Sequence, residues 1–205
     1  MHSSKLIKQF PLISDQMTLS RLEVILRSLE KVLEQGITGD IVEFGCYKGT
    51  TSLFIRRLLN LYLADRHDFH VYDSFAGLPA KSKQDSSPIG YAFEAGKLST
   101  SKKQLLQEFY KANLRPPIIH RGWFDQLTAS DIPTQIAFAF LDGDFYESVK
   151  SSLGLVWPRL SKGGVVVIDD YLRDALPGAT LAVEQFFSGT KYGMKAINNL
   201  AVITK

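Results

Sequence analysis

Hydrophobic residues recur along the chain with two different spacings, which predict amphipathic helices and short buried strands. Helical spacing occurs at residues 19–33, 50–61, 147–160 and 180–187. Short apolar runs predict strands at 40–44, 69–72, 117–120, 135–141 and 165–168. The last run contains only β-branched residues, which is typical of a strand that is covered on both faces.

The order of these elements predicts the fold class. Strand, turn, helix and strand follow one another within residues 40–72, as in a right-handed βαβ unit. The alternation continues to residue 168, and Asn198–Asn199 favours a tight turn between final strands at 192–197 and 200–204. We therefore expect an α/β fold with a doubly wound, mostly parallel seven-stranded sheet that ends in an antiparallel hairpin. Pro158 should distort the last turn of the helix at 147–160.

No linker rich in Pro, Gly or Ser divides the 205 residues, so we expect one domain over 1–205 with a helical N-terminal segment at 1–38. Residues 76–98 interrupt the alternation. They are too many for an ordinary connection between elements, and loops of this length are commonly lids or binding loops. The sequence therefore predicts a lid loop at 76–98.

Composition and charge narrow the class of protein. The formal net charge of +3 is too small to indicate a nucleic-acid or anionic-membrane partner. The longest apolar run, residues 136–141, is too short to span a bilayer, and the first residues lack the pattern of a signal peptide. The single cysteine, Cys46, excludes an intramolecular disulfide and a multi-cysteine metal site. We expect a cytoplasmic protein.

Glycines follow the first predicted strand, and an acid ends the second. After Glu43, Gly45 and Gly49 let the backbone turn tightly and lie close to a ligand ahead of a helix, although their spacing is not that of a diphosphate cradle. Asp73 ends the second strand, where an acid in nucleotide-binding α/β folds accepts hydrogen bonds from ribose hydroxyls. A nucleoside without a diphosphate cradle indicates S-adenosylmethionine. The alternatives are a structural turn and a helix cap.

Four acids follow two further strands: Asp142 and Asp144 after 135–141, and Asp169 and Asp170 after 165–168. At neighbouring ends of parallel strands, so many carboxylates would repel one another unless a cation is present. Oxygen ligands without a His or Cys cluster favour Mg²⁺ or a similar divalent cation over zinc. For Asp144, capping of the next helix is the alternative.

Residues around the third predicted strand are weaker candidates. His120 is either a base or a hydrogen-bonded structural residue. Trp123 and Phe124 follow Gly122 and either flank an adenine ring or pack in the core. No feature of the sequence marks Cys46 as a reactive thiol.

Together these segments resemble the macrocin O-methyltransferase (TylF-like) family, whose members depend on S-adenosylmethionine and a metal ion. The matching stretches are IVEFGCYKGTTSLFIRRLL at 41–59, VYDSFAGLP at 71–79, RGWFDQL at 121–127, FLDGDFYESVKSSLGLVWPRLSKGGVVVIDDY at 140–171 and, weakly, GATLAVEQFF at 178–187. The resemblance implies a Rossmann-like, class I methyltransferase fold.

The resemblance also implies roles for individual residues. Those expected to bind S-adenosylmethionine are Glu43, Gly45, Tyr47, Gly49, Thr50, Asp73, Ser74, Gly122, Trp123 and Asp142. Mg²⁺ or another divalent cation would be held by Asp142, Asp169 and Asp170, and Asp144 would be the general base that deprotonates the acceptor hydroxyl. The acceptor would be a small molecule, with its hydroxyl on a sugar, polyol or phenol of a secondary metabolite. The resemblance leaves open whether the protein forms a homodimer.

Two other functions compete with this one. Asp142 and Asp144 also form the D-x-D pattern of a metal-dependent glycosyltransferase, although that function leaves Glu43–Gly49 and Asp169–Asp170 without roles. The third possibility is a non-catalytic α/β module that binds S-adenosylmethionine without transferring its methyl group.

Overall fold

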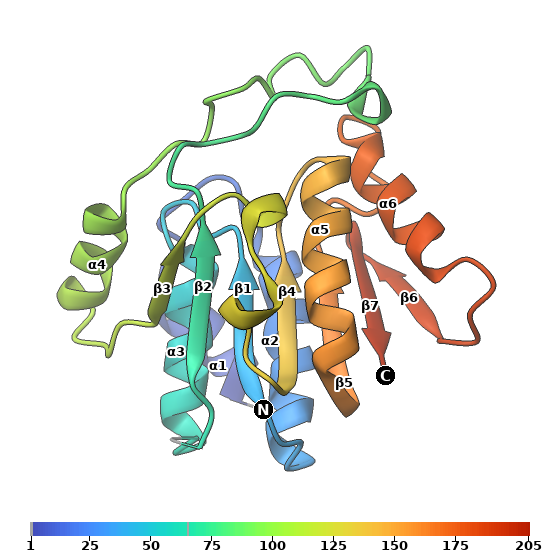
Figure 1. Cartoon of the computed structure of the whole chain (residues 1–205). Helices are drawn as coiled ribbons and strands as arrows, with labels where there is room; N and C mark the ends of the chain where they lie inside the picture. Colours follow the sequence, from blue (N-terminus) through green and yellow to red (C-terminus); the bar gives the residue numbers. More distant parts are fainter. Residues whose placement is uncertain (1, 65) are drawn as a thin grey trace.

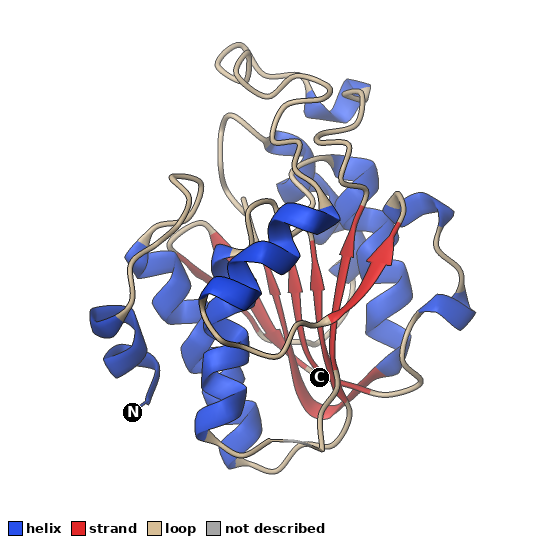
Figure 2. Cartoon of the chain, turned by 90° about the vertical axis from the view of Figure 1, so that its left-hand side faces the viewer, coloured by secondary structure: helices blue, strands red, loops and turns tan. Residues whose placement is uncertain are grey.

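The computed structural model describes residues 2–64 and 66–205, which form a central sheet with helices on both faces (Figures 1 and 2). The strands are β1 (Asp40–Phe44), β2 (Phe69–Asp73), β3 (Ile118–Arg121), β4 (Ile136–Leu141), β5 (Leu160–Ile168), β6 (Met194–Ile197) and β7 (Leu200–Thr204). The helices are α1 (His2–Gln9), α2 (Leu19–Glu34), α3 (Thr50–Leu61), α4 (Lys102–Lys111), α5 (Tyr146–Val156) and α6 (Pro177–Phe187).

The strand order of the sheet is β3-β2-β1-β4-β5-β7-β6. Strands β1 to β5 pair in parallel, whereas β7 is antiparallel to both β5 and β6. The predicted seven-stranded, doubly wound sheet with its C-terminal hairpin is therefore confirmed. The direction of winding reverses between β1 and β4, and ligands of such sheets bind beyond the strand ends at this point.

Two apolar layers hold the helices on the sheet. Leu22, Ile25 and Leu26 of α2 pack with α3 residues against one face, and Val149 and Leu153 of α5 pack against the other. All six residues of β4 are buried, because helices cover this central strand on both sides. The ends of β1 and β4 are thereby held rigidly at the edge of the core.

The boundaries of several elements differ from the sequence prediction. Helix α5 ends at Val156, and the 3-10 turn Trp157–Arg159 follows, as expected from the effect of Pro158. Strand β5 begins at Leu160, earlier than predicted, because Leu160 already pairs with Ile136 of β4. Helix α6 likewise begins earlier, at Pro177, and β6 begins later, at Met194.

The predicted turn at Asn198–Asn199 is confirmed by its backbone. Both residues have positive φ angles, 53° and 60°, as the tightest hairpin turns require. None of the helices in the described parts of the chain is both long and apolar enough to cross a membrane.

Residues 76–98 arch over the carboxyl ends of the strands as an extended loop with one 3-10 turn, Lys83–Asp85 (Figure 1). Asp85 is buried at the centre of this loop. Its Oδ1 accepts a hydrogen bond of 2.7 Å from the amide of Tyr146, and its Oδ2 accepts from the hydroxyl and amide of Ser82. A Cβ on Gly178 would lie 1.9 Å from Asp85 Oδ1, so this position has room only for glycine. The loop is therefore fastened to the first turns of α5 and α6.

Candidate functional site

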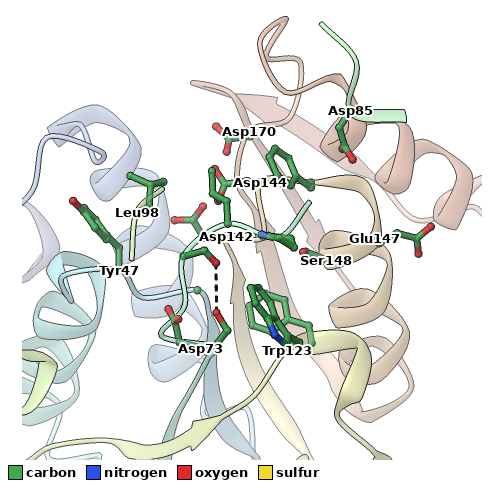
Figure 3. Close-up of a pocket in the computed structure, with 18 of the residues that line it drawn as sticks. Tyr47, Asp73, Asp85, Leu98, Trp123, Asp142, Asp144, Glu147, Ser148 and Asp170 are labelled. Carbon is green, nitrogen blue, oxygen red and sulfur yellow. Dashed lines mark hydrogen bonds between the residues drawn. The ribbon is translucent and has the colours of Figure 1, made fainter. Parts of the chain in front are cut away.

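A cavity of about 520 Å³ lies beyond the carboxyl ends of β1, β2, β4 and β5. Its walls come from these strand ends, from the 76–98 loop, and from Gln16 and Arg21, which lie just before α2 and in its first turn. Figure 3 shows the acids of β2 and β4 facing the cavity, between Tyr47 on one side and Trp123 on the other. The cavity therefore occupies the point of the sheet where this fold class binds its ligands.

The end of β2 is tied to the turn after β1 by Asp73. Its Oδ2 accepts hydrogen bonds from the amide (2.9 Å) and the thiol (3.3 Å) of Cys46, and its Oδ1 accepts from the amide of Phe75 (2.7 Å). No helix begins at Asp73, so the helix-cap alternative does not apply. The carboxylate and the neighbouring Ser74 both line the cavity, where a ribose could meet them.

The turn after β1 runs very close to the end of β4. Gly45 has a φ of 85°, and a Cβ at this position would lie 2.1 Å from the carbonyl oxygen of Asp142. A side chain here would push the two strand ends apart. Tyr47, which also has a positive φ, 46°, presents its side chain to the same cavity.

Glu43 is completely buried on β1, and only one of its carboxylate oxygens is paired. Oε2 accepts a hydrogen bond of 2.5 Å from Ser52, whereas Oε1 has no partner among the described residues. Burial is the main reason that the pKa of Glu43 is raised to about 8. The hydrogen bond from Ser52 lowers this pKa, and the charges of Asp142 and Asp73 raise it further. A second cavity, of about 30 Å³, adjoins Glu43 and Thr50, and the Thr50 hydroxyl also lacks a partner within the described part of the chain. This arrangement suits a cationic group such as an ammonium.

Three of the four predicted acids gather on the other side of the cavity. Asp142, Asp144 and Asp170 each offer a carboxylate oxygen within 4.8 Å of the others (Figure 3). Burial and the nearby Asp170 raise the pKa of Asp142 to about 7, and the same causes, with Asp142, raise that of Asp144 well above its usual range. The negative charge of this group is thus incompletely balanced by the protein.

Asp144 does not cap helix α5, because the N-cap position belongs to Phe145. Its backbone is left-handed, with a φ of 56°. This uncommon conformation places the carboxylate beside Asp142 and Asp170.

The fourth acid, Asp169, is engaged elsewhere. Its Oδ2 forms an ion pair with Arg21 of α2, and its Oδ1 accepts a hydrogen bond of 2.8 Å from the amide of Asp170. Asp170 in turn accepts a hydrogen bond of 2.5 Å from Arg173. Sequence reasoning missed both arginines: Arg21 lies beside a helical pattern interpreted only as packing, and Arg173 lies in an irregular connection.

The remaining sequence-predicted residues are divided between the site and its supports. Trp123 and Phe124 line the large cavity, and Phe124 also packs edge-on against Phe44 at 5.2 Å between ring centroids. Gly122 does not line the cavity. Gly49 and Thr50 begin helix α3, and Thr50 borders only the small cavity.

His120 and Cys46 have structural surroundings. The ring of His120 stacks on Tyr72 at 4.4 Å between ring centroids, and its Nε2 lies 2.9 Å from Nδ1 of His70. None of these three residues lines the cavity. The Cys46 thiol is buried, and burial together with Asp73 raises its pKa well above the usual range, which keeps it protonated.

Comparisons with known proteins agree with this geometry. The model of the family described as macrocin O-methyltransferase (TylF) matches residues 5–204. Over 175 residues, the chain is 34% identical to 8-demethyl-8-(2,3-dimethoxy-alpha-L-rhamnosyl)-tetracenomycin-C 4'-O-methyltransferase of Streptomyces olivaceus, a match that covers 82% of this chain and 67% of the relative. It is 31% identical to demethyldecarbamoylnovobiocin O-methyltransferase of Streptomyces niveus over 75% of this chain and 61% of that enzyme.

A solved structure shares the fold. The O-methyltransferase NovP superposes with a TM-score of 0.80 over 91% of this chain and 80% of that chain, at 24% sequence identity. The family match spans nearly the whole chain, and the sheet order and the position of the cavity agree with it. The chain therefore belongs to the macrocin O-methyltransferase family and is an enzyme with the class I methyltransferase fold.

Proposed function

We propose that this protein is an S-adenosylmethionine- and Mg²⁺-dependent O-methyltransferase that methylates a hydroxyl group of a sugar, or of a related polyol or phenol, in a secondary metabolite. The observation that carries the proposal is the cavity itself. It has Asp73, an acid placed to bind ribose hydroxyls, on one side and the clustered carboxylates on the other. The relatives named above, which methylate small molecules, support the choice of acceptor. We expect the enzyme to act in the cytoplasm.

The cofactor half of the proposal rests on Glu43, Asp73 and the turn between Gly45 and Thr50. The free, buried Oε1 of Glu43 suits the ammonium group of S-adenosylmethionine, and the Asp73 carboxylate suits its ribose hydroxyls. Trp123 and Ser74 line the part of the cavity where the adenine and ribose would lie. S-adenosylmethionine supplies a methyl group that is already activated by its sulfonium.

The metal half rests on the three gathered acids. Their donor atoms are all oxygens, and the raised pKa values of Asp142 and Asp144 indicate a place where added positive charge would be favourable. The ligand set that the resemblance implies is Asp142, Asp169 and Asp170. Two of these, Asp142 and Asp170, belong to the gathered acids, and Asp169 directly precedes Asp170 but is paired with Arg21. When bound, Mg²⁺ acts as a Lewis acid that makes an acceptor hydroxyl more acidic.

Asp144 is the proposed general base. It lies next to Asp142 and Asp170, lines the cavity, and has a raised pKa, which suits a carboxylate that takes up a proton. The 76–98 loop forms the outer wall through Leu78, Pro79 and Leu98, so it would hold the acceptor and exclude water.

The decisive experiment is a transfer assay with methyl-labelled S-adenosylmethionine. Rhamnosides, other deoxysugar glycosides and phenols serve as acceptors, with and without Mg²⁺ after treatment with a chelator. The proposal predicts label on a sugar or phenol oxygen and loss of transfer in the chelated protein. Cofactor binding without transfer to any acceptor would favour the non-catalytic module. Binding of a nucleotide sugar in place of S-adenosylmethionine would favour the glycosyltransferase, against which family membership argues.

A further inference from the structure

Arg21 joins helix α2 to the acid-rich side of the cavity. From the first turn of α2 it reaches Asp169 at the end of β5, a residue 148 positions away. The Arg21 side chain is 13% exposed and that of Asp169 only 1%, so the ion pair is largely removed from water. Nη1 of Arg21 donates a hydrogen bond of 3.3 Å to the carbonyl of Gln16, and Nε is buried without a partner among the described residues.

The two arginines at this site differ in their surroundings. Arg173 pairs with Asp170 from a loop, its side chain is 35% exposed, and its guanidinium lies 5.0 Å from the ring centroid of Phe93 in the 76–98 loop. Arg21 is the more buried of the two. Its charge is therefore less screened by water. Arg21 lowers the pKa of Asp142 more than Arg173 does, whereas Arg173 has the larger effect on the pKa of Asp144.

Both oxygens of Asp169 are occupied in this arrangement. Oδ1 accepts from the amide of Asp170, and Oδ2 faces Arg21. A divalent cation and a guanidinium bound to the same carboxylate oxygen would repel one another strongly at this depth. Coordination of a divalent cation through Oδ2 of Asp169 therefore requires Arg21 to withdraw.

We propose that Arg21 is a built-in counter-cation that competes with the divalent ion for Asp169, so that metal binding releases Arg21 from the acid cluster. The inference rests on the metal half of the proposed function. It adds that Arg21 of α2 partly balances the negative charge of the site until the ion binds.

The release of Arg21 has a consequence for the cofactor side. The carbonyl that Arg21 holds belongs to Gln16, which lines both the large cavity and the small cavity beside Glu43. Ser14 and Met17 border the small cavity as well. Metal binding should therefore loosen residues 14–18 where they cover the turn after β1.

An ordinary structural ion pair would behave in the opposite way. If Arg21 only held Asp169 in position for the metal, its removal would weaken ion binding. If Arg21 competes with the metal, its removal strengthens ion binding. The sign of the change in metal affinity therefore distinguishes the two roles.

The test compares Arg21→Gln and Arg21→Lys with the wild type and with Arg27→Gln. Arg27 is a matched control on the same helix, because it forms an exposed ion pair with Glu23, outside the site. Mn²⁺ binding is measured by calorimetry and electron paramagnetic resonance on protein saturated with S-adenosylhomocysteine. Competition predicts at least about fivefold tighter Mn²⁺ binding for Arg21→Gln, within the usual range of coupling between linked binding events. Arg21→Lys, which keeps a charge, should change less, and Arg27→Gln should remain within about twofold of wild type.

Hydrogen exchange provides a readout that does not depend on affinity. Mn²⁺ should speed amide exchange in residues 14–22 of the wild type, whereas Arg21→Gln should exchange rapidly there even without Mn²⁺. Unchanged or weaker Mn²⁺ binding in Arg21→Gln would overturn the inference and leave the proposed function standing. If Arg21→Gln does not fold, Mn²⁺ must still speed exchange in the wild type, and slowed or unchanged exchange overturns the inference. A wild type that binds S-adenosylhomocysteine but no Mn²⁺ would instead remove the metal half of the proposed function, and this inference with it.

Discussion

Asp73 and Cys46 are joined across two neighbouring strand ends by a hydrogen bond of 2.9 Å from the Cys46 amide to Asp73 Oδ2. The same carboxylate lines the large cavity, so one side chain both holds the turn after β1 and faces the proposed ribose site. Asp73→Ala should weaken binding of S-adenosylmethionine by on the order of 1.5–3 kcal/mol, because a hydrogen bond to a charged group is lost. Calorimetry on the purified variant measures this change.

Asp68→Ala is a suitable control for this prediction. Asp68 is an exposed acid just before β2, at the opposite end from Asp73, and it forms an ion pair with Arg115 at 3.9 Å. Its replacement should leave cofactor affinity unchanged. Wild-type affinity in Asp73→Ala would show that Asp73 only supports the turn.

Asp144→Asn tests base catalysis separately from metal binding. The amide is nearly isosteric with the carboxylate but cannot take up a proton, so turnover should fall by roughly 10²–10⁴ while Mn²⁺ and cofactor still bind. Activity should recover in part at high pH, where the acceptor ionises without help. Steady-state rates and Mn²⁺ titrations, with the exposed Asp174→Asn as the control, separate these effects. A variant that loses Mn²⁺ affinity would identify Asp144 as a ligand instead.

Asp85→Ala should release the 76–98 loop. The substitution leaves the buried Tyr146 amide without its acceptor, at a cost of about 1–3 kcal/mol in the free energy of unfolding. Thermal melting should show the loss as a Tm about 2–4 °C lower for each kcal/mol. Trypsin should cleave faster after Lys81 and Lys97, and cofactor with acceptor should slow this cleavage if the loop is a lid.

Ser87→Ala provides the comparison for the loop. Ser87 also ties the loop to the β5–α6 connection, but through one exposed hydrogen bond of 2.7 Å to the carbonyl of Asp174. Its loss should change melting and cleavage much less. Equal cleavage rates in Asp85→Ala and wild type would mean that apolar packing, rather than Asp85, fastens the loop.

The His70–His120 pair should make stability depend on pH. Burial lowers the pKa of both rings. At His70, the nearby Asp40 and Asp68 oppose this decrease in pKa. At His120, the neighbouring His70 and Lys102 lower the pKa further, and Asp131 opposes the decrease. Because the unfolded chain takes up protons that the folded protein excludes, the pair destabilises the fold as pH falls below the unfolded value of about 6.5.

The variant His120→Gln should flatten this pH dependence. Tm values measured between about pH 7.5 and 5.5 should fall less in the variant than in the wild type, because one excluded proton is gone. His2→Gln, an exposed position on α1, should keep the wild-type slope. A slope that is identical in all three proteins would assign the acid sensitivity to other groups.

Local pattern was sufficient to predict the sheet and the place of the site. Apolar runs with strand or helix spacing gave the order of elements, and the carboxyl ends of parallel strands share one edge whatever the details of packing. For this reason Asp73, Asp142 and Asp170 could be expected at one cavity, and the structure brings them there. Boundaries such as the start of β5 were less predictable, because pairing with β4 extends the strand into Gly163 and Gly164.

Contacts between irregular segments were decided only by the tertiary structure. Arg21 and Asp169 are 148 residues apart and Asp85 and Tyr146 are 61 apart, and no local spacing links either pair. The left-handed backbone of Asp144 belongs to a tight local turn, closed by a hydrogen bond of 2.6 Å from the amide of Phe145 to the carbonyl of Gly143. The strand ends bring the acids together, but the way in which α2 and the 76–98 loop pack over those ends determines which acid meets a cation and which remains free.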